Sequence, residues 1–306
     1  MIKPFKPFAL MILFSGTLIS CGSASKPEKP EDLAKTKNAP NLNKRYRKTL
    51  FLLYFPKENK SIWAEKYFLE NSGDKDTITV VPCKMGAPAA SPDSATIRTK
   101  AGEQYHCWLD KANIFVNAAT TLRINENLQG KKEFDLKGEC FIETKKKNCT
   151  VTIDSIGIRV SAGSKINMMG YENEPGITIT LISGSADVSA PGHHFTMNRH
   201  LNKLSFLKGA AKFSQTATAS EGAEVWTEGI LYGERLPCSY VFRCMERLYA
   251  KNFVWQGSDS SCDKTFLIPY RDMSLRDVLE EIKTQFKLYP TVSSDTIFLH
   301  EKSSVK

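Results

Sequence analysis

The sequence has 306 residues and lacks any run of about 18 or more apolar residues, which excludes a polytopic membrane protein. Its eight cysteines are too few per residue for a mini-protein held together by disulfides. It contains no glycine-rich phosphate loop, nucleophile elbow or metalloprotease helix motif. With 41% hydrophobic and 25% charged residues, the composition is that of a globular protein, which excludes collagen, coiled coil and wholesale disorder.

The first 21 residues predict export. Lys3 and Lys6 form a basic start, and the apolar stretch Phe8–Ile19 is too short for a bilayer-spanning helix, which needs about 20 residues. The stretch ends at Cys21, in a context that resembles the lipobox of bacterial lipoproteins. We therefore expect a lipoprotein signal peptide over residues 1–20 and acylation of the Cys21 thiol. The alternative is a cleaved signal peptide with a chance cysteine at its end.

The charge balance is basic, with 42 Lys and Arg against 33 Asp and Glu and a formal charge of +9. The densest basic runs are Arg45–Lys48 and Lys145–Lys147. In an exported protein such runs are expected to be solvated or to attract anionic lipid headgroups, so no nucleic-acid partner is predicted. We expect a membrane-anchored envelope protein that faces the periplasm from the outer membrane, with display on the cell surface left open.

Export also changes the interpretation of the cysteines, because an oxidising envelope favours disulfides. Seven cysteines remain when Cys21 is set aside, so at least one thiol is free or pairs with another chain. Cys140 and Cys149 bracket a polar turn between two apolar segments and are the favoured bridge. The other candidate pairs are Cys83 with Cys107 and Cys238 with Cys262.

The N-terminal part after the signal peptide contains two stretches. Residues 21–44 are rich in Pro, Lys, Glu and Asn and predict a flexible tether. Residues 45–90 have no firm assignment. They contain an apolar stretch at Leu50–Phe55, a candidate helix at Trp63–Glu70 and a β-prone stretch at Thr77–Val81.

Residues 91–215 predict a β domain. Short runs alternate apolar with polar residues, as in Ile156, Ile158 and Val160, and glycines separate the runs. Period-two alternation buries one face of each strand and leaves the other in water. Many short strands of this kind predict a mainly β fold, an all-β sandwich or roll, with a solenoid as the weaker alternative because no strict repeat occurs.

Residues 222–301 predict a small α/β domain. Apolar residues at helical spacing indicate a helix within Arg235–Tyr249. Ser274, with Asp277 three residues later, forms a capping-box pattern that begins a second amphipathic helix. Strands are expected at Phe253–Trp255, Phe266–Ile268 and Ile297–Leu299.

Several blocks of the chain, in the right order, resemble the FecR family over about 200 of the 306 positions. The order and spacing of these blocks together carry the resemblance. The blocks are Thr99, Gly102 and Glu103, Leu109-Asp110, Val116-Asn117-Ala118, Leu136-Lys137-Gly138-Glu139, Phe141-Ile142-Glu143, Val160 to Gly163, Ile166-Asn167-Met168, Thr180-Leu181, Gly184, and then Trp226, Gly229 and Leu231.

This resemblance implies a FecR-like β domain followed by a domain similar to the short N-terminal domain of secretins and TonB-dependent receptors. FecR-like proteins are typically anti-sigma regulators that sense an outer-membrane transporter. We expect a non-enzymatic envelope lipoprotein that binds a TonB-dependent transporter or its signalling domain in iron- or nutrient-linked regulation. The anti-sigma activity that the family implies conflicts with a chain in which no cytoplasmic domain is recognised. The alternative is a structural or surface-displayed lipoprotein for adhesion or assembly.

Catalysis has no support in the sequence, and no enzyme activity or cofactor is expected. His193, His194 and His200 could ligate zinc, although a solvated loop is the more common reading of such a cluster. Cys244 lies on an apolar helical face, which favours a buried inert thiol. Phe253–Trp255 could accept a partner strand at a sheet edge, although a place in the core is favoured for it.

Overall fold

The structure is a computed structural model that describes residues 46–55, 60–69, 94–109, 112–126, 132–208, 212–216, 222–233, 236–257 and 265–301. All of them belong to one compact unit of the chain. They are mainly β, which confirms the predicted fold class. The expected signal peptide, Cys21, the tether at 21–44 and the stretch Thr77–Val81 lie outside the described residues.

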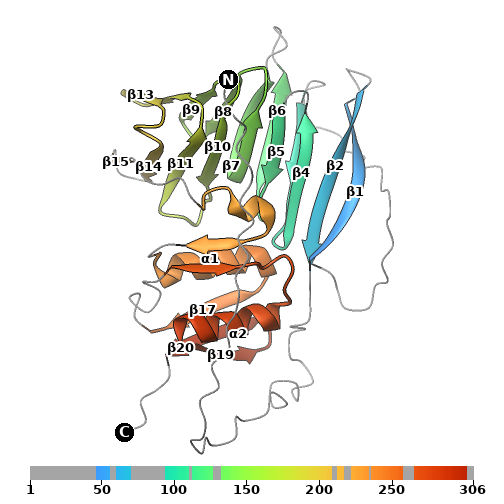
Figure 1. Ribbon diagram of the computed structural model, residues 1–306, viewed down its shortest axis with the longest axis vertical. Helices are drawn as coiled ribbons and strands as arrows, with labels where there is room; N and C mark the ends of the chain where they lie inside the picture. The colour runs from blue at the N-terminus through green and yellow to red at the C-terminus, as the bar shows by residue number, and fades with distance from the viewer. Residues whose placement is uncertain are drawn as a thin grey trace, which may run out of the picture. The chain divides into compact units, whose positions relative to one another are not determined.

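Within the described ranges, fifteen strands form one branched sheet, whose course can be followed in Figure 1. The main path runs β1-β2-β4-β5-β7-β10-β11-β14-β15, and a branch runs β3-β6-β7-β8-β9-β12-β13. The strands are β1 (Tyr46–Phe55), β2 (Lys60–Leu69), β3 (Ser94–Arg98), β4 (Glu103–Leu109), β5 (Ala112–Val116), β6 (Thr121–Glu126), β7 (Lys132–Thr144), β8 (Cys149–Ile153), β9 (Ile156–Val160), β10 (Lys165–Gly170), β11 (Gly176–Ser183), β12 (Ala186–Ala190), β13 (His193–Met197), β14 (Lys203–Leu207) and β15 (Lys212–Thr216).

Strand β7 joins the main path to the branch. Its first half pairs with β6 and β8, and its second half pairs with β5 and β10. Gly138 lies between the halves at φ +121°, a backbone conformation that side chains rarely adopt. A Cβ at this position would lie 2.3 Å from the Thr120 hydroxyl oxygen, so glycine is required where the strand passes from one set of partners to the other. The sheet curls as a result into half a barrel.

The core of the β region lies between the main path and the branch. Alternate residues of each strand point inward, because side chains of successive strand residues lie on opposite faces. Leu136 and Ile158 from the branch, and Ile142 and Ile179 from the main path, are all fully buried in one cluster. The predicted alternation in residues 91–215 therefore corresponds to the buried pattern, and two sheet faces packed on one core match the expected sandwich or roll.

The candidate helix at Trp63–Glu70 was wrong. Its residues 63–69 belong to strand β2, which pairs antiparallel with β1 over ten residues and with β4 on its other side, and Glu70 lies outside the described residues. Local apolar spacing fitted a helix. The neighbouring strands β1 and β4 supply hydrogen-bonding partners along both edges of this segment, and long-range pairing of that kind overrides local propensity.

The predicted Cys140–Cys149 bridge was also wrong, since both thiols are free and buried. It assumed that the two cysteines face each other across a hairpin. The chain instead crosses after β7, and β8 lies parallel to the first half of β7. Cys140 therefore neighbours Val116 and Met168, whereas Cys149 is opposite Val160 in the branch.

Cys107 is likewise free and buried, so the predicted Cys83–Cys107 bridge does not form. Burial raises the pKa of the Cys107 and Cys149 thiols to about 12 in each case, which makes both thiols unreactive at neutral pH. Cys238 is disulfide-bonded, as the third candidate pair requires of it. Cys83 and Cys262 lie outside the described residues.

The C-terminal domain packs two helices with two small sheets (Figure 1). Strands β16 and β18 pair antiparallel, and β20 lies between β17, to which it is parallel, and β19. Both predicted helices and all three predicted strands are present, and the Ser274–Asp277 capping box is formed. Strands β16 and β19 had not been predicted. The elements are η2 (Val225–Glu228), β16 (Leu231–Gly233), α1 (Cys238–Tyr249), β17 (Asn252–Gln256), β18 (Phe266–Ile268), α2 (Leu275–Phe286), β19 (Leu288–Ser293) and β20 (Thr296–Glu301).

Replacement of Gly138 by alanine tests the role of the β7 bend. We expect Gly138→Ala to lower the free energy of unfolding by about 3 kcal/mol or more, because it combines an unfavourable φ with a clash against Thr120. Gly163→Ala is the matched control, with φ +75° and nothing within 4 Å of its Cβ. Gly163→Ala should lower the free energy of unfolding by about 1 kcal/mol. Equal losses in urea denaturation would contradict this account.

Candidate interdomain site

A half-buried carboxylate organises the face of the sheet that meets the C-terminal domain. Glu139 projects from β7. Asn117 directly follows the neighbouring strand β5, and Asn167 lies on the other neighbouring strand, β10. The Asn117 Nδ2 group donates to Glu139 Oε2 at 2.7 Å, and the Asn167 Nδ2 group donates to Oε1 at 2.9 Å. Both carboxylate oxygens therefore have amide donors.

The same amides connect Glu139 to the C-terminal domain. Trp226 Nε1 donates to Asn167 Oδ1 at 3.0 Å. On the other side, Gln104 Nε2 donates to Asn117 Oδ1 and to the Tyr270 hydroxyl, each at 2.7 Å. The Tyr270 hydroxyl then donates to the Trp226 carbonyl oxygen at 3.1 Å. We call this group of residues, Gln104, Asn117, Glu139, Asn167, Trp226 and Tyr270, the junction network.

A second carboxylate, which is buried, joins the two domains by charge. The Glu174 side chain is only 1% exposed, and its two oxygens accept from different arginines of helix α1. Arg243 lies 2.8 Å from Oε2, and Arg247 lies 2.9 Å from Oε1. The Arg247 guanidinium also lies over the Tyr171 ring, 4.1 Å from its centroid. The turn after β10 is thereby bound to α1.

Burial changes the pKa values of ionisable groups in this region. It raises the pKa of the Glu139 carboxyl above its usual value, while the hydrogen bonds from Asn167 and Asn117 and the charge of Arg247 oppose the rise. Burial also raises the pKa of the Cys244 thiol to about 11, against the opposing charge of Arg247. Cys244 is half-buried and accepts from the Arg247 guanidinium at 3.3 Å, and its high pKa is consistent with the inert thiol that was predicted.

A cavity of about 330 Å³ lies between the sheet and the C-terminal domain. Polar side chains from the sheet form one wall, and mainly apolar and aromatic side chains from the C-terminal domain form the other. Glu139 keeps some accessible surface because it borders this space. The lining residues used below are Glu139, Thr178, Thr180, Lys203, Trp226, Tyr232, Leu236 and Arg247.

The FecR-like blocks that lie far apart in the sequence meet here. Asn117, Glu139, Asn167 and Trp226 each came from a different block, and all four belong to the junction network. Sequence reasoning missed Glu174 and its arginines. The only signal was the i, i+4 spacing of Arg243 and Arg247, which places two cations on one helix face.

The histidine cluster is not assembled. His193 and His194 are consecutive on β13, so their side chains point to opposite faces of the sheet. His200 is exposed beside Arg199. Among the residues that the structure describes, no three His, Cys, Asp or Glu side chains are grouped to hold a metal ion.

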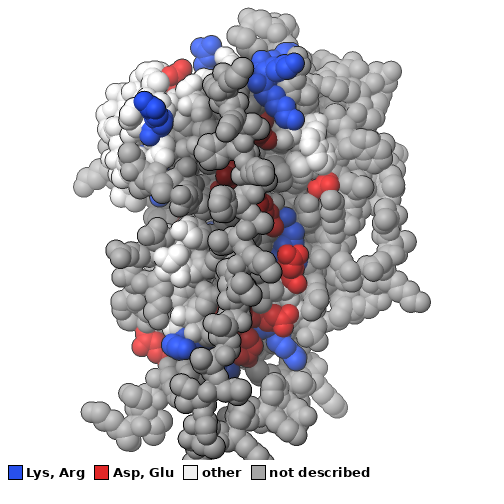
Figure 2. Space-filling model, in the orientation of Figure 1, with Lys and Arg blue, Asp and Glu red and all other residues white. Residues whose placement is uncertain are grey.

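Charges on the visible surface are mixed. Figure 2 shows described basic and acidic side chains lying beside one another over this face. Over the described ranges, no helix is both long and apolar enough to cross a bilayer.

Comparison with known proteins identifies the fold. No family model and no curated protein matches the chain. The structure is similar to two crystal structures from Parabacteroides distasonis, at 1.65 and 2.50 Å resolution, each described as a "putative anti-sigma factor". Both have a TM-score of 0.59 and 19% sequence identity, and the matches cover 68% and 69% of this chain and all of each crystal chain. At this identity the likeness establishes the fold alone.

Substitution of Glu174 tests the charge contact between the domains. We expect Glu174→Gln to lower the free energy of unfolding by about 3 kcal/mol, because the largely buried Arg247 loses its carboxylate. Arg243→Gln is the control, since Arg243 is 26% exposed and Glu174 keeps Arg247 as its partner. It should cost about 1 kcal/mol. A denaturation midpoint for Glu174→Gln at or above that of Arg243→Gln would refute the prediction.

Proposed function

We propose that this chain is a non-enzymatic binding and signalling module of the cell envelope, related to the FecR family of anti-sigma regulators. The observation that carries the proposal is the meeting of four FecR-like blocks in one network. Asn117, Glu139, Asn167 and Trp226 are spread over more than a hundred residues, yet they are joined by direct hydrogen bonds. Chance matches to short blocks have no reason to converge in this way.

The structural neighbours support the same reading. Each is described as a "putative anti-sigma factor", and the likeness extends over the whole length of each crystal chain. The buried polar groups of the junction also favour a structural role. Glu139 is engaged by two amides and Glu174 by two guanidinium groups, so each acid has its partners within the protein.

The partner in this proposal is a TonB-dependent transporter or its signalling domain. Strand β17 offers a route for docking. In the described part of the chain it pairs with β20 on one side alone, and Val254 at its centre is 37% exposed. Phe253 is buried in the core of the domain, and Trp255 packs against that core. These two side chains therefore hold the strand in place. A partner strand could add to this edge through main-chain hydrogen bonds.

Site-specific photo-crosslinking tests the docking. A photoreactive residue at position 254 should give an adduct that contains a TonB-dependent transporter or a signalling protein, identified by mass spectrometry. The control position is Glu280, which is exposed on α2 of the same domain. It should give no such adduct. If neither position captures a protein of these classes in intact cells, the proposed partner is wrong.

The lipid anchor has its own test. Cys21→Ser should abolish labelling with a fatty-acid analogue and move the protein from the membrane fraction to the soluble fraction, because one thiol carries the acyl chains. Continued sedimentation of Cys21→Ser with membranes would place the anchor elsewhere and remove the lipoprotein part of the proposal.

A further inference from the structure

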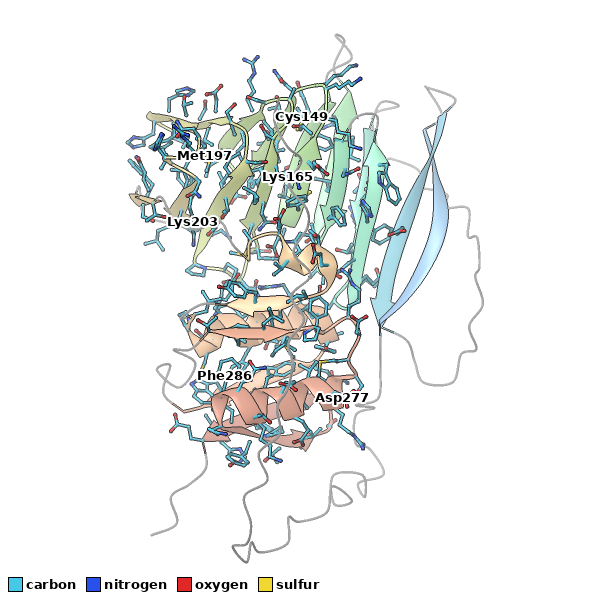
Figure 3. The ribbon with its side chains drawn as sticks, viewed as in Figure 1. Cys149, Lys165, Met197, Lys203, Asp277 and Phe286 are labelled. Atoms are coloured by element: carbon cyan, nitrogen blue, oxygen red, sulfur yellow. The ribbon has the colours of Figure 1, made fainter. Side chains whose placement is uncertain are left out.

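A row of polar side chains crosses the sheet wall of the interdomain cavity. Asn167 on β10 is opposite Thr180 on β11, and Thr180 is opposite Lys203 on β14. Thr178 is two residues from Thr180 on the same strand, so both project from the same face. Figure 3 labels Lys203 at the edge of the β region. Lys203, Thr178 and Thr180 all line the cavity.

Most of the polar groups around the cavity already have protein partners. Among the described residues that line the cavity, Glu139 is the one carboxylate, and both of its oxygens accept from amides. Arg247 is the second lining cation, and it is paired with Glu174. Of the charged groups that line the cavity, Glu139 and Arg247 therefore have hydrogen-bonding partners, whereas Lys203 has none in the described residues.

Three donors face the cavity without a partner. In the described part of the chain, Lys203 makes no ion pair, and neither the Lys203 ammonium nor the Thr178 or Thr180 hydroxyl makes a side-chain hydrogen bond. Thr180 is only 6% exposed, and it lines the cavity. Two hydroxyls and an ammonium in one row along the cavity wall offer hydrogen-bond donors to an anionic group.

The opposite wall of the cavity suits the apolar part of a ligand. Trp226, Tyr232 and Leu236 of the C-terminal domain line it. The volume of about 330 Å³ is at the small end of the range for ligand sites, about 300–1,000 Å³. We propose that this cavity binds a small organic anion, whose carboxylate or phosphate contacts Lys203, Thr178 and Thr180 and whose apolar part packs on Trp226 and Tyr232.

Such a ligand would contact both domains at once and would favour their assembled arrangement, since it binds only where both walls are present. The site is separate from the edge of β17. It therefore goes beyond the proposed docking function, and direct binding to the purified protein can fail without any bearing on partner capture.

Calorimetric titration with phenylacetate, phenylacetamide and inorganic phosphate tests the proposal. Phenylacetate should bind saturably to the wild-type protein, and Lys203→Met should weaken its binding at least tenfold, because the ammonium is lost and most of the side-chain length is kept. Thr180→Val, which has nearly the same shape, should weaken it severalfold. Phenylacetamide should bind more weakly than phenylacetate, and equally to the wild-type protein and Lys203→Met.

Lys165→Met is the matched control, since Lys165 lies on β10 of the same sheet and its ammonium is 3.8 Å from Glu143, outside the cavity. It should leave the binding of phenylacetate unchanged. Binding of phosphate with the same dependence on Lys203 would also support the anion site. No saturable binding of either anion, or equal binding to the wild-type protein and both cavity variants, would overturn the proposal.

Discussion

The arrangement of this protein depends on two carboxylates, Glu139 and Glu174, that lie where the β region meets the C-terminal domain. A buried charge without partners is strongly destabilising, so each acid requires donors in fixed positions. Glu139 receives two amides of the sheet, one of which is held in turn by Trp226 of the C-terminal domain. Glu174 receives two arginines of α1. Separation of the domains would leave both acids with broken or weakened contacts.

The bend in β7 makes this possible. Gly138 lets one strand serve two sets of partners, and the next residue, Glu139, projects toward the C-terminal domain. The core is enclosed on one side of the strand, and the junction network is built on the other. A single glycine thus links the curl of the sheet to the place where the second domain packs. The cavity follows from the same geometry, because it lies beside the junction network and shares Glu139 with it.

Local sequence patterns predicted correctly those elements whose structure depends on interactions between neighbouring residues. Alternation along Ile156, Ile158 and Val160 predicted a strand with one buried face, and that strand is β9. Ser274 and Asp277 predicted a helix start, because their side chains and backbone groups satisfy each other within four residues. The same reasoning failed at Trp63–Glu70, where the partners of the segment are strands that only the folded chain brings to it.

The sequence by itself determined the mainly β fold, the small α/β domain and the residues of the FecR-like blocks, because periodicity and capping are properties of neighbouring residues. Only the tertiary structure decided that Cys140 and Cys149 stay apart, that Glu174 pairs with Arg243 and Arg247, and that Thr180 and Lys203 share a cavity wall. These outcomes depend on strand crossings and on register between segments far apart in the chain. No local pattern encodes such contacts, since they arise from the packing of whole elements.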